Sequence, residues 1–335
     1  MNFTDPLLTR RQLLASTAAS ALALSPSLSH ADAAWPTKPL RLVVPFAPGG
    51  ATDVLARMLA PKMSAELGQS IIIENRAGAS GQIGTQFVKN SPADGTVFLV
   101  NTDSSLTILP YIVADVPYSP ARDFMMVGKI ATLPWALSVP AANNIKNIAQ
   151  FIDYIKKDPK QANYAVPTTG GVPEMIGEMI GKKAGVEMTI LPYAGGAAII
   201  TSVLGAQISS GVTGTPEAFN MEKTGKAVVI GVSGTKRAAY LPHVPTFEES
   251  GLPGLTADSW FGIYAPKALP KPMAERFNVA MNNAIKDPDT QKKIADMAIE
   301  VTTTNFAEAE KFYAEAITFW ASVYKDKPKP TEAKK

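Results

Sequence analysis

Short apolar runs alternate with amphipathic segments along the first third of the chain. Apolar side chains dominate positions 41–45, 70–74 and 96–100, and each run leads into a turn rich in glycine, proline or serine. Between the runs, apolar residues such as Leu55 and Leu59 recur at the spacing of one helix face. This order of strand, helix, strand, helix and strand predicts an open parallel α/β sheet.

The same alternation begins again in a second block. Helical spacing covers 148–157, and further helices are expected to follow the turns at 167–171 and 192–196. Strand-like runs occupy 164–166, 188–191, 208–213 and 227–232. Thr246 and Glu249 form a capping-box pattern, which predicts one more short helix. No close sequence repeat accompanies this repeated order, so the two blocks share a topology and not a sequence.

The end of the chain has the pattern of packed helices. Apolar spacing predicts helices over 271–286 and 289–297, and Asn305 begins a third helix with Glu308 at its capping-box position. The apolar and aromatic side chains of this third helix fall on one face: Ala309, Phe312, Tyr313, Ala316, Trp320 and Val323. We expect that face to pack on a core and not to bind a ligand.

The N-terminal segment 1–33 predicts an export signal. The paired arginines at 10–11 precede an apolar stretch, 13–24, that is too short to cross a bilayer. An A-x-A triplet at 31–33 offers a cleavage site that would make Ala34 the new N-terminus, and cleavage two residues earlier is the alternative. The arginine pair favours the twin-arginine export route over an ordinary secretory signal.

Composition and charge narrow the class of protein. Apolar residues make up 46% and charged residues 18% of the 335 residues, which is typical of a globular protein, and the length favours two domains. The absence of cysteine excludes disulfides and thiolate metal sites. The lysine-rich tail 325–335 holds five positive and two negative groups, which equals the net charge of +3. The neutral body argues against a nucleic-acid partner, and we expect the tail to be disordered.

The motifs of common enzymes are absent from the sequence. After removal of the export signal, His243 is the one remaining histidine, and it lies in a loop bounded by prolines. No H-E-x-x-H, G-x-S-x-G, Walker or strand-linked G-x-G-x-x-G motif occurs. These absences weigh against an enzyme, and we predict neither a cofactor nor a metal.

The remaining distinctive feature is a set of glycine-rich turns at the ends of predicted strands. Such a turn exposes backbone N–H groups that have no partner within the following helix, and the helix dipole adds partial positive charge there. Glycine lets a ligand come close to this backbone. Two such turns facing each other could hold a carboxylate or a dicarboxylate without an arginine. The alternative is that these turns only connect elements, as loops do in every α/β protein.

Six segments carry a resemblance to a known family. They are 44–57 (VPFAPGGATDVLAR), 74–81 (ENRAGASG), 191–195 (LPYAG), 241–246 (LPHVPT), 249–254 (ESGLPG) and 260–262 (WFG). In this order and spacing they resemble the periplasmic solute-binding proteins of tripartite tricarboxylate transporters, often called the Bug family. The resemblance covers the whole exported chain.

The resemblance implies an α/β fold of two domains, the periplasmic-binding-protein fold of type II, with two open sheets, flanking helices and two interdomain crossings. We place the crossings near 133–140 and 254–266. One domain would then combine 34–139 with 254–324, and the other would span 140–253. Family members bind organic acids in a cleft between the two domains, and this cleft closes on the ligand by hinge motion. Their ligands include citrate, acidic amino acids, other dicarboxylates and aromatic acids such as terephthalate, which they deliver to a membrane permease.

The resemblance also implies binding residues in both domains. In the first domain they are Phe46, Ala47, Pro48, Gly49, Gly50, Thr52 and Asp53, with added hydroxyls from Ser104 and Ser105. In the second domain they are Thr168, Thr169, Gly170 and Gly171, which would hold the distal acid group, and Tyr193, Ala194 and Gly195, which would form another wall. Gly49, Gly50 and Thr52 would donate directly or through water. Asp53 would cap the first helix and hold its loop, and Phe46 would pack on the ligand's carbon skeleton.

Two positions depart from the family pattern. Glu174 stands where the family often has histidine, and Ala194 stands where it often has lysine. If both side chains reach the cleft, a tricarboxylate is disfavoured, and a mono- or dicarboxylate with an apolar or aromatic middle is favoured. The alternative is that both positions face solvent.

The resemblance thus predicts a monomeric periplasmic receptor whose partners are a small organic acid and the permease subunits. Two alternatives stay open. One is a secreted hydrolase that uses Ser104 or Ser105 together with carboxylates in the same cleft. The other is a receptor that presents its ligand to a sensor and not to a permease.

Overall fold

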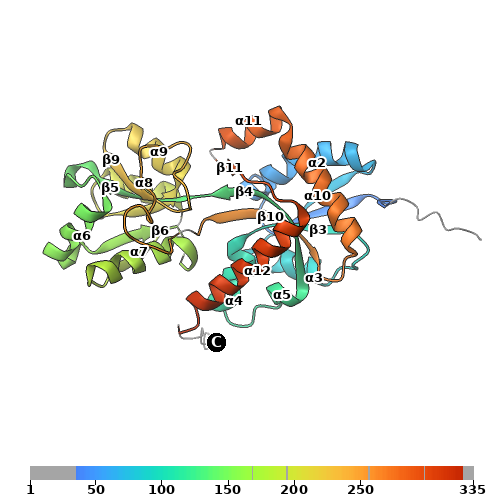
Figure 1. The fold of residues 1–335 in the computed structure, drawn as a ribbon, viewed down its shortest axis with the longest axis horizontal. Coiled ribbons are helices and arrows are strands. Elements are labelled where there is room, and N and C mark those ends of the chain that lie inside the picture. The colour runs from blue at the N-terminus through green and yellow to red at the C-terminus, as the bar shows by residue number, and fades with distance from the viewer. Residues whose placement is uncertain (1–34, 168, 194, 256, 298, 327–335) are drawn as a thin grey trace, which may run out of the picture.

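The computed structural model describes residues 35–167, 169–193, 195–255, 257–297 and 299–326. Within these ranges the chain forms two lobes, each with one sheet and helices on its faces (Figure 1). The first lobe holds a six-stranded sheet and the second lobe a five-stranded sheet. The predictions of an export signal over 1–33 and of most of the disordered tail lie outside the described residues.

The sheet of the first lobe is mixed. Its order is β11-β4-β10-β3-β1-β2, with β1 (Leu40–Val44), β2 (Ile71–Asn75), β3 (Val97–Thr102), β4 (Phe124–Leu133), β10 (Ser259–Pro266) and β11 (Glu300–Val301). β1 pairs in parallel with β2 and β3, whereas β10 is antiparallel to both β3 and β4. The prediction of a parallel sheet is therefore correct for β1 to β3 and wrong for the rest, because β10 enters from the second lobe and runs against its neighbours.

The sheet of the second lobe repeats this mixture. Its order is β7-β6-β8-β5-β9, with β5 (Trp135–Pro140), β6 (Asn163–Val166), β7 (Thr189–Pro192), β8 (Gly211–Gly214) and β9 (Ala227–Val232). β6 is parallel to β7 and β8, and β5 is antiparallel to β8 and β9. Only Pro134 separates β4 from β5, so the chain passes directly from one sheet to the other there, and it returns between Val232 and Ser259. The domain limits at 139/140 and 253/254 stay a prediction.

Helices cover the faces of both sheets (Figure 1). They are α2 (Ala51–Leu67), α3 (Gln82–Lys89), α4 (Leu109–Ile112), α5 (Pro120–Asp123), α6 (Ile148–Lys157), α7 (Gly171–Ala184), α8 (Gly196–Leu204), α9 (Thr215–Lys223), α10 (Lys271–Lys286), α11 (Pro288–Asp296) and α12 (Phe306–Val323), with short helical turns η1 (Ala79–Gly81), η2 (Ser104–Ile108), η3 (Ala141–Asn143) and η4 (Pro159–Gln161). The predicted helices over 148–157 and 271–286 are confirmed, and so is the capping box of Asn305 and Glu308.

The short helix predicted after Thr246 does not form. Both capping-box hydrogen bonds are present: the Thr246 amide donates to Glu249 over 2.8 Å, and the Glu249 amide donates to the Thr246 hydroxyl over 3.0 Å. The chain nevertheless makes only a turn, because Gly251 takes the left-handed conformation (φ +80°) and the Leu252 amide bonds back to Phe247.

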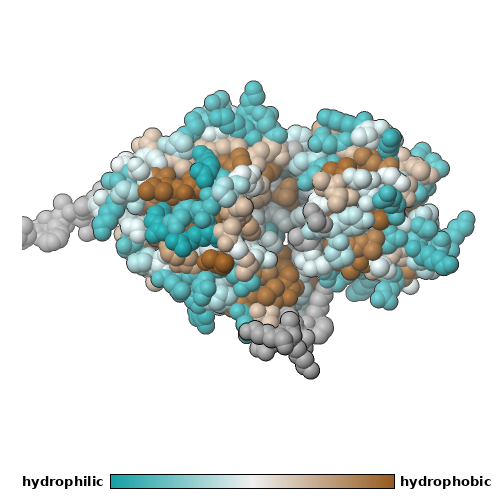
Figure 2. Space-filling view, turned by 180° about the vertical axis from the view of Figure 1, so that it is seen from behind, coloured by the Kyte–Doolittle hydropathy of each residue, from teal (hydrophilic) through white to brown (hydrophobic). Residues whose placement is uncertain are grey.

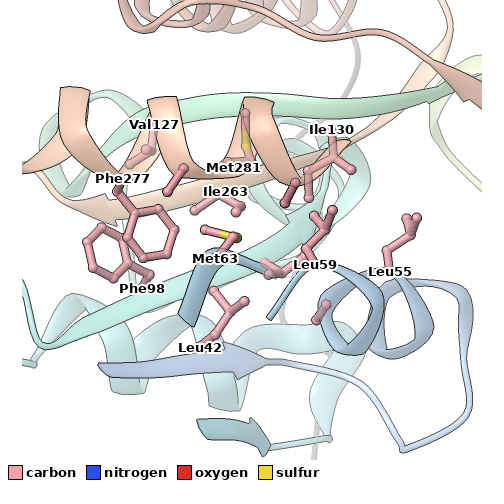
Figure 3. Close-up of a cluster of buried hydrophobic side chains, with 14 of the residues drawn as sticks. Leu42, Leu55, Leu59, Met63, Phe98, Val127, Ile130, Ile263, Phe277 and Met281 are labelled. Atoms are coloured by element: carbon pink, nitrogen blue, oxygen red, sulfur yellow. The ribbon is translucent and has the colours of Figure 1, made fainter. Parts of the chain in front are cut away.

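The central strands of the first sheet are buried on both faces, since successive side chains point to opposite faces and helices cover both. Leu42, Phe98 and Ile263 point to one face, where they pack with α2 and α10 through Leu59 and Phe277 (Figure 3). The rings of Phe98 and Phe277 are stacked with their centroids 3.8 Å apart. This cluster joins the sheet to α2, the helix that follows the first glycine-rich turn.

The last helix, α12, packs on the other face of the same sheet. Val43 and Leu99 point to this face and pack in one cluster with Tyr313 of α12. Further along α12, Trp320 is 1% exposed and packs in the core of the second lobe. The prediction that the aromatic stripe packs on a core is confirmed, and α12 contacts both lobes.

Candidate functional site

The first glycine-rich turn is held in place by Asp53. The Gly49 amide donates to the Asp53 carboxylate over 2.9 Å, Asn75 donates to it over 2.8 Å, and Arg57 pairs with it at 2.9 Å. Burial raises the pKa of Asp53, but the hydrogen bonds from Arg57, Gly49 and Asn75 outweigh burial and hold the pKa below its ordinary value. The predicted capping role is wrong, because Gly50 is the N-cap of α2 and Asp53 lies in the first turn and reaches back to the loop.

A cavity of about 490 Å³ lies between the lobes. Its lining residues are Ser80, Ser104, Ser105, Ile108, Leu109, Ile112 and Val113 from the first lobe, and Thr169, Gly170 and Glu174 from the second. The molecule is hollowed between its lobes on the face opposite that of Figure 1, with hydrophobic surface beneath the hollow (Figure 2). The structure therefore brings four predicted site residues together, namely Ser104, Ser105, Thr169 and Gly170.

Hydroxyl groups of the cavity are held by other protein groups. The Ser105 hydroxyl donates to the Ser80 carbonyl over 2.9 Å, and the hydroxyl oxygens of Ser104 and Thr102 are 3.0 Å apart. A methyl group placed on Gly81 would lie 2.8 Å from the Ser105 hydroxyl oxygen and 3.4 Å from the Phe46 ring. Phe46 is therefore close to the serine side of the cavity. Neither serine is hydrogen-bonded to a histidine or a lysine among the described residues.

In the second lobe, the start of α7 already has partners within the protein. The Gly170 amide donates to the Glu174 carboxylate over 2.7 Å, and the Gly171 amide donates to the Tyr324 hydroxyl over 3.0 Å. Tyr324 follows α12, and its ring stacks on that of Tyr111 with the centroids 5.6 Å apart. The two amides that we expected to hold the distal acid group would thus have to exchange these partners for a ligand.

The glycine-rich turn at 192–196 also lies beside a carboxylate. A methyl group placed on Gly196 would be 3.2 Å from the Glu217 carboxylate, and one on Gly214 would be 2.6 Å from it. Burial raises the pKa of Glu217 above its ordinary value. The turns at 46–53, 167–171 and 192–196 therefore each have a carboxylate of the chain's own against them, from Asp53, Glu174 and Glu217.

Several predicted site residues do not line the described cavity. These are Ala47, Pro48, Gly49, Gly50, Thr52, Asp53, Gly171, Tyr193 and Gly195, together with Phe46 at its edge, whereas Thr168 and Ala194 lie outside the described residues. Glu174 does line the cavity, so the alternative that it only faces solvent is wrong. Ser80 was missed although it stands in the quoted segment 74–81. Ile108 and Ile112 gave no signal, because an apolar stretch is indistinguishable in sequence from core.

Asp103 lies directly before the cavity serines and is 1% exposed. Its Oδ2 has no hydrogen-bond partner within the described residues. Burial raises its pKa from 3.8 to about 7, against hydrogen bonds from Ser104 and Ser259. Because the folded state holds this proton more tightly than the unfolded state, the resulting stabilisation is complete below about pH 3.8 and is lost as the pH rises through about 7.

We therefore expect the free energy of unfolding of the wild type to fall between pH 4 and pH 7. The fall should exceed that of Asp103→Asn by up to about 4 kcal/mol, since each unit of pKa shift is worth about 1.4 kcal/mol. Urea unfolding at each pH measures the difference. Asp296→Asn, at an exposed position of α11, is the matched control and should keep the wild-type slope. Equal slopes in all three proteins would show that Asp103 is ionised throughout this range.

Two sheets joined by two crossings, with a cavity between the lobes, are the architecture of a solute-binding protein that closes on its ligand. A family model described as "Tripartite tricarboxylate transporter family receptor" matches residues 55–327. The chain belongs to this family and is a periplasmic-type solute-binding receptor, which confirms the predicted family and the two-domain α/β fold. No helix in the described ranges has the length and apolarity needed to cross a membrane.

Individual relatives agree with this assignment. A "UPF0065 protein in tcbD-tcbE intergenic region" of Pseudomonas sp. (strain P51) is 32% identical over 87% of this chain and 86% of the relative. The solved structure "R. palustris Rpa4515 with adipate" is 30% identical with a TM-score of 0.71, covering 87% of this chain and 97% of that one. "MatC (Rpa3494) from Rhodopseudomonas palustris with bound malate" is 25% identical with a TM-score of 0.67, covering 87% of this chain and all (100%) of that one.

Proposed function

We propose that this receptor captures a small mono- or dicarboxylate with an apolar middle and delivers it to a tripartite membrane permease. The observation that carries the proposal is the composition of the cavity between the lobes. Hydroxyl groups of Ser80, Ser104 and Thr169 offer hydrogen bonds, and Ile108 and Ile112 offer an apolar wall. A volume of about 490 Å³ is within the range of small-molecule sites.

Charge supports an acid of low charge. The described residues that line the cavity include no lysine, arginine or histidine, but they do include the carboxylate of Glu174. A tricarboxylate would therefore meet repulsion without a compensating cation. Relatives with bound adipate and malate support a dicarboxylate, and the apolar wall also suits an aromatic acid such as terephthalate.

The remaining parts of the proposal concern the binding loops and the setting. The predicted loop residues 46–53, 168–171 and 193–195 would contact the ligand when the lobes close and the amides exchange partners. The chain would be exported with its signal removed near Ala33 and would act as a monomer. Presentation of the ligand to a sensor would use the same cleft with a different partner.

Thermal unfolding in the presence of named acids tests the proposed function. We expect adipate, malate or terephthalate to raise the melting temperature, because a ligand at about 100 times its Kd stabilises the folded state by about 2.7 kcal/mol. Citrate should stabilise less than the best dicarboxylate, and the acids should be recovered unchanged. Glucose is the neutral control. Stabilisation by glucose without stabilisation by any of the acids would contradict the proposal.

A further inference from the structure

A second cavity, of about 390 Å³, lies away from the cleft. It is bounded by β4, β10 and β11 and by α12, which passes in front of β4 and β10 in Figure 1. Thr235 and Lys236, which follow β9 of the second sheet, complete its wall. It shares no lining residue with the cavity between the lobes.

The cavity contains an ammonium group without an acceptor. Lys129 projects from β4, and its Nζ lies 4.4 Å from the centroid of the Phe312 ring. Burial lowers the pKa of Lys129, and the charges of Asp258 and Asp103 oppose this. Among the described residues, no hydrogen-bond or ion-pair partner lies within 4.0 Å of this ammonium. The Lys129 side chain is half-buried, and an anionic oxygen that enters the cavity would supply the acceptor that the described protein groups do not.

The acidic groups of the cavity, by contrast, already have donors. Asp258 accepts a hydrogen bond from the Ser233 hydroxyl. Glu300 accepts one from the Ala239 amide over 3.0 Å and lies 3.9 Å from the Lys236 ammonium. Glu315, the third carboxylate of the wall, lies 3.9 Å from the Lys311 ammonium. The Lys129 ammonium is therefore the cavity's hydrogen-bond donor without a protein partner among the described residues, and the ligand group that complements it is an anionic oxygen.

Aromatic rings supply the rest of the wall. Trp260 and Phe312 meet edge to face with their centroids 4.9 Å apart, and Phe319 and Trp320 do so at 5.2 Å. All four rings line the cavity. Rings arranged in this way favour a flat apolar body, and the volume suits a single ring with a short substituent.

We propose that this cavity is a second binding site, which takes a small aromatic or branched-alkyl monocarboxylate, contrary to the expectation that the aromatic stripe of α12 binds no ligand. The carboxylate pairs with the Lys129 ammonium, and the apolar body lies among Trp260, Phe312 and Trp320. The walls of this cavity come from both lobes. If the cavity has a different shape in the open and the closed arrangement of the lobes, a bound ligand will favour the arrangement that it fits better.

Fluorine NMR of the protein labelled with 5-fluorotryptophan tests this site directly. The chain has four tryptophans, and two of them, Trp260 and Trp320, line the cavity. We expect benzoate to shift the signals of these two and to leave that of Trp35 unchanged. Benzamide, which has the same shape without the charge, should bind about tenfold more weakly because it lacks the ionic contact.

Substitution of Lys129 completes the test. Lys129→Met should weaken benzoate binding about tenfold and leave benzamide binding unchanged, whereas Lys129→Arg should retain the preference for benzoate. Lys156→Met, at an exposed position of α6, is the matched control. Benzoate that leaves Trp260 and Trp320 unshifted, or that binds no better than benzamide, would overturn the proposal. The benzoate–benzamide comparison uses the wild type, so it stands even if Lys129→Met fails to fold.

Discussion

Replacing Glu174 by glutamine is expected to shift the ligand preference toward doubly charged acids. Glu174 lines the cleft and accepts a hydrogen bond from the Gly170 amide, a contact that the glutamine oxygen can also make. The substitution therefore removes a negative charge while it leaves the turn supported. A charge in such a partly buried site is worth about 1–3 kcal/mol to a second charge several ångströms away. We expect the ratio of adipate affinity to hexanoate affinity to rise about tenfold or more.

Isothermal titration of the two acids measures this ratio. Glu178→Gln is the matched control, because Glu178 lies one turn further along α7 and does not line the cleft cavity. It should leave the ratio unchanged. If Glu174→Gln and Glu178→Gln give the same ratio as the wild type, Glu174 does not act on the bound acid. If none of the three proteins binds either acid, the proposed ligand class itself is wrong.

Replacing Phe277 by alanine should cause a large loss of stability. Phe277 is fully buried, stacks on Phe98 and joins α10 to the first sheet (Figure 3). Truncation of a buried phenylalanine removes its burial energy and leaves a cavity, at a cost of about 3–5 kcal/mol. Urea unfolding followed by circular dichroism measures the loss.

The matched control for Phe277 stands on the same helix. Val279 is 53% exposed, so Val279→Ala should change the free energy of unfolding by no more than about 0.5 kcal/mol. A loss below about 1 kcal/mol for Phe277→Ala would mean that the stacked pair is not part of a close-packed core.

The local pattern of apolar and polar residues was sufficient to predict several of the helices, but it did not predict the strands that link the two lobes. The helix over 148–157 has a clear apolar stripe, and Asn305 with Glu308 forms the hydrogen bonds that its spacing predicts. β4, at 124–133, went unpredicted although it is buried on both faces like β3, which its apolar run did predict. The direction of β10 depends on where the chain returns, which no local pattern records.

The candidate site was predictable in its loops and not in their partners. Ser105 and Gly170 line the cavity as expected, whereas the described residues of the predicted turns at 46–53 and 193–195 do not. The bond from the Gly171 amide to Tyr324 joins residues 153 positions apart, and no sequence spacing announces it. The place of Glu217 beside Gly196 depends in the same way on how α8 and α9 pack.

The carboxylates at the glycine-rich turns have a consequence for how the receptor behaves in salt. Chloride or sulfate arriving at Gly49 or Gly170 meets a donor already engaged by a side chain four residues away. Because each carboxylate is attached to the chain only four residues from the amide, its effective concentration at that amide is higher than the millimolar concentration of a free inorganic ion. Displacement of the side chain then favours an organic acid that adds contacts on the opposite lobe over an inorganic ion that adds none, so the receptor is expected to discriminate against common salts.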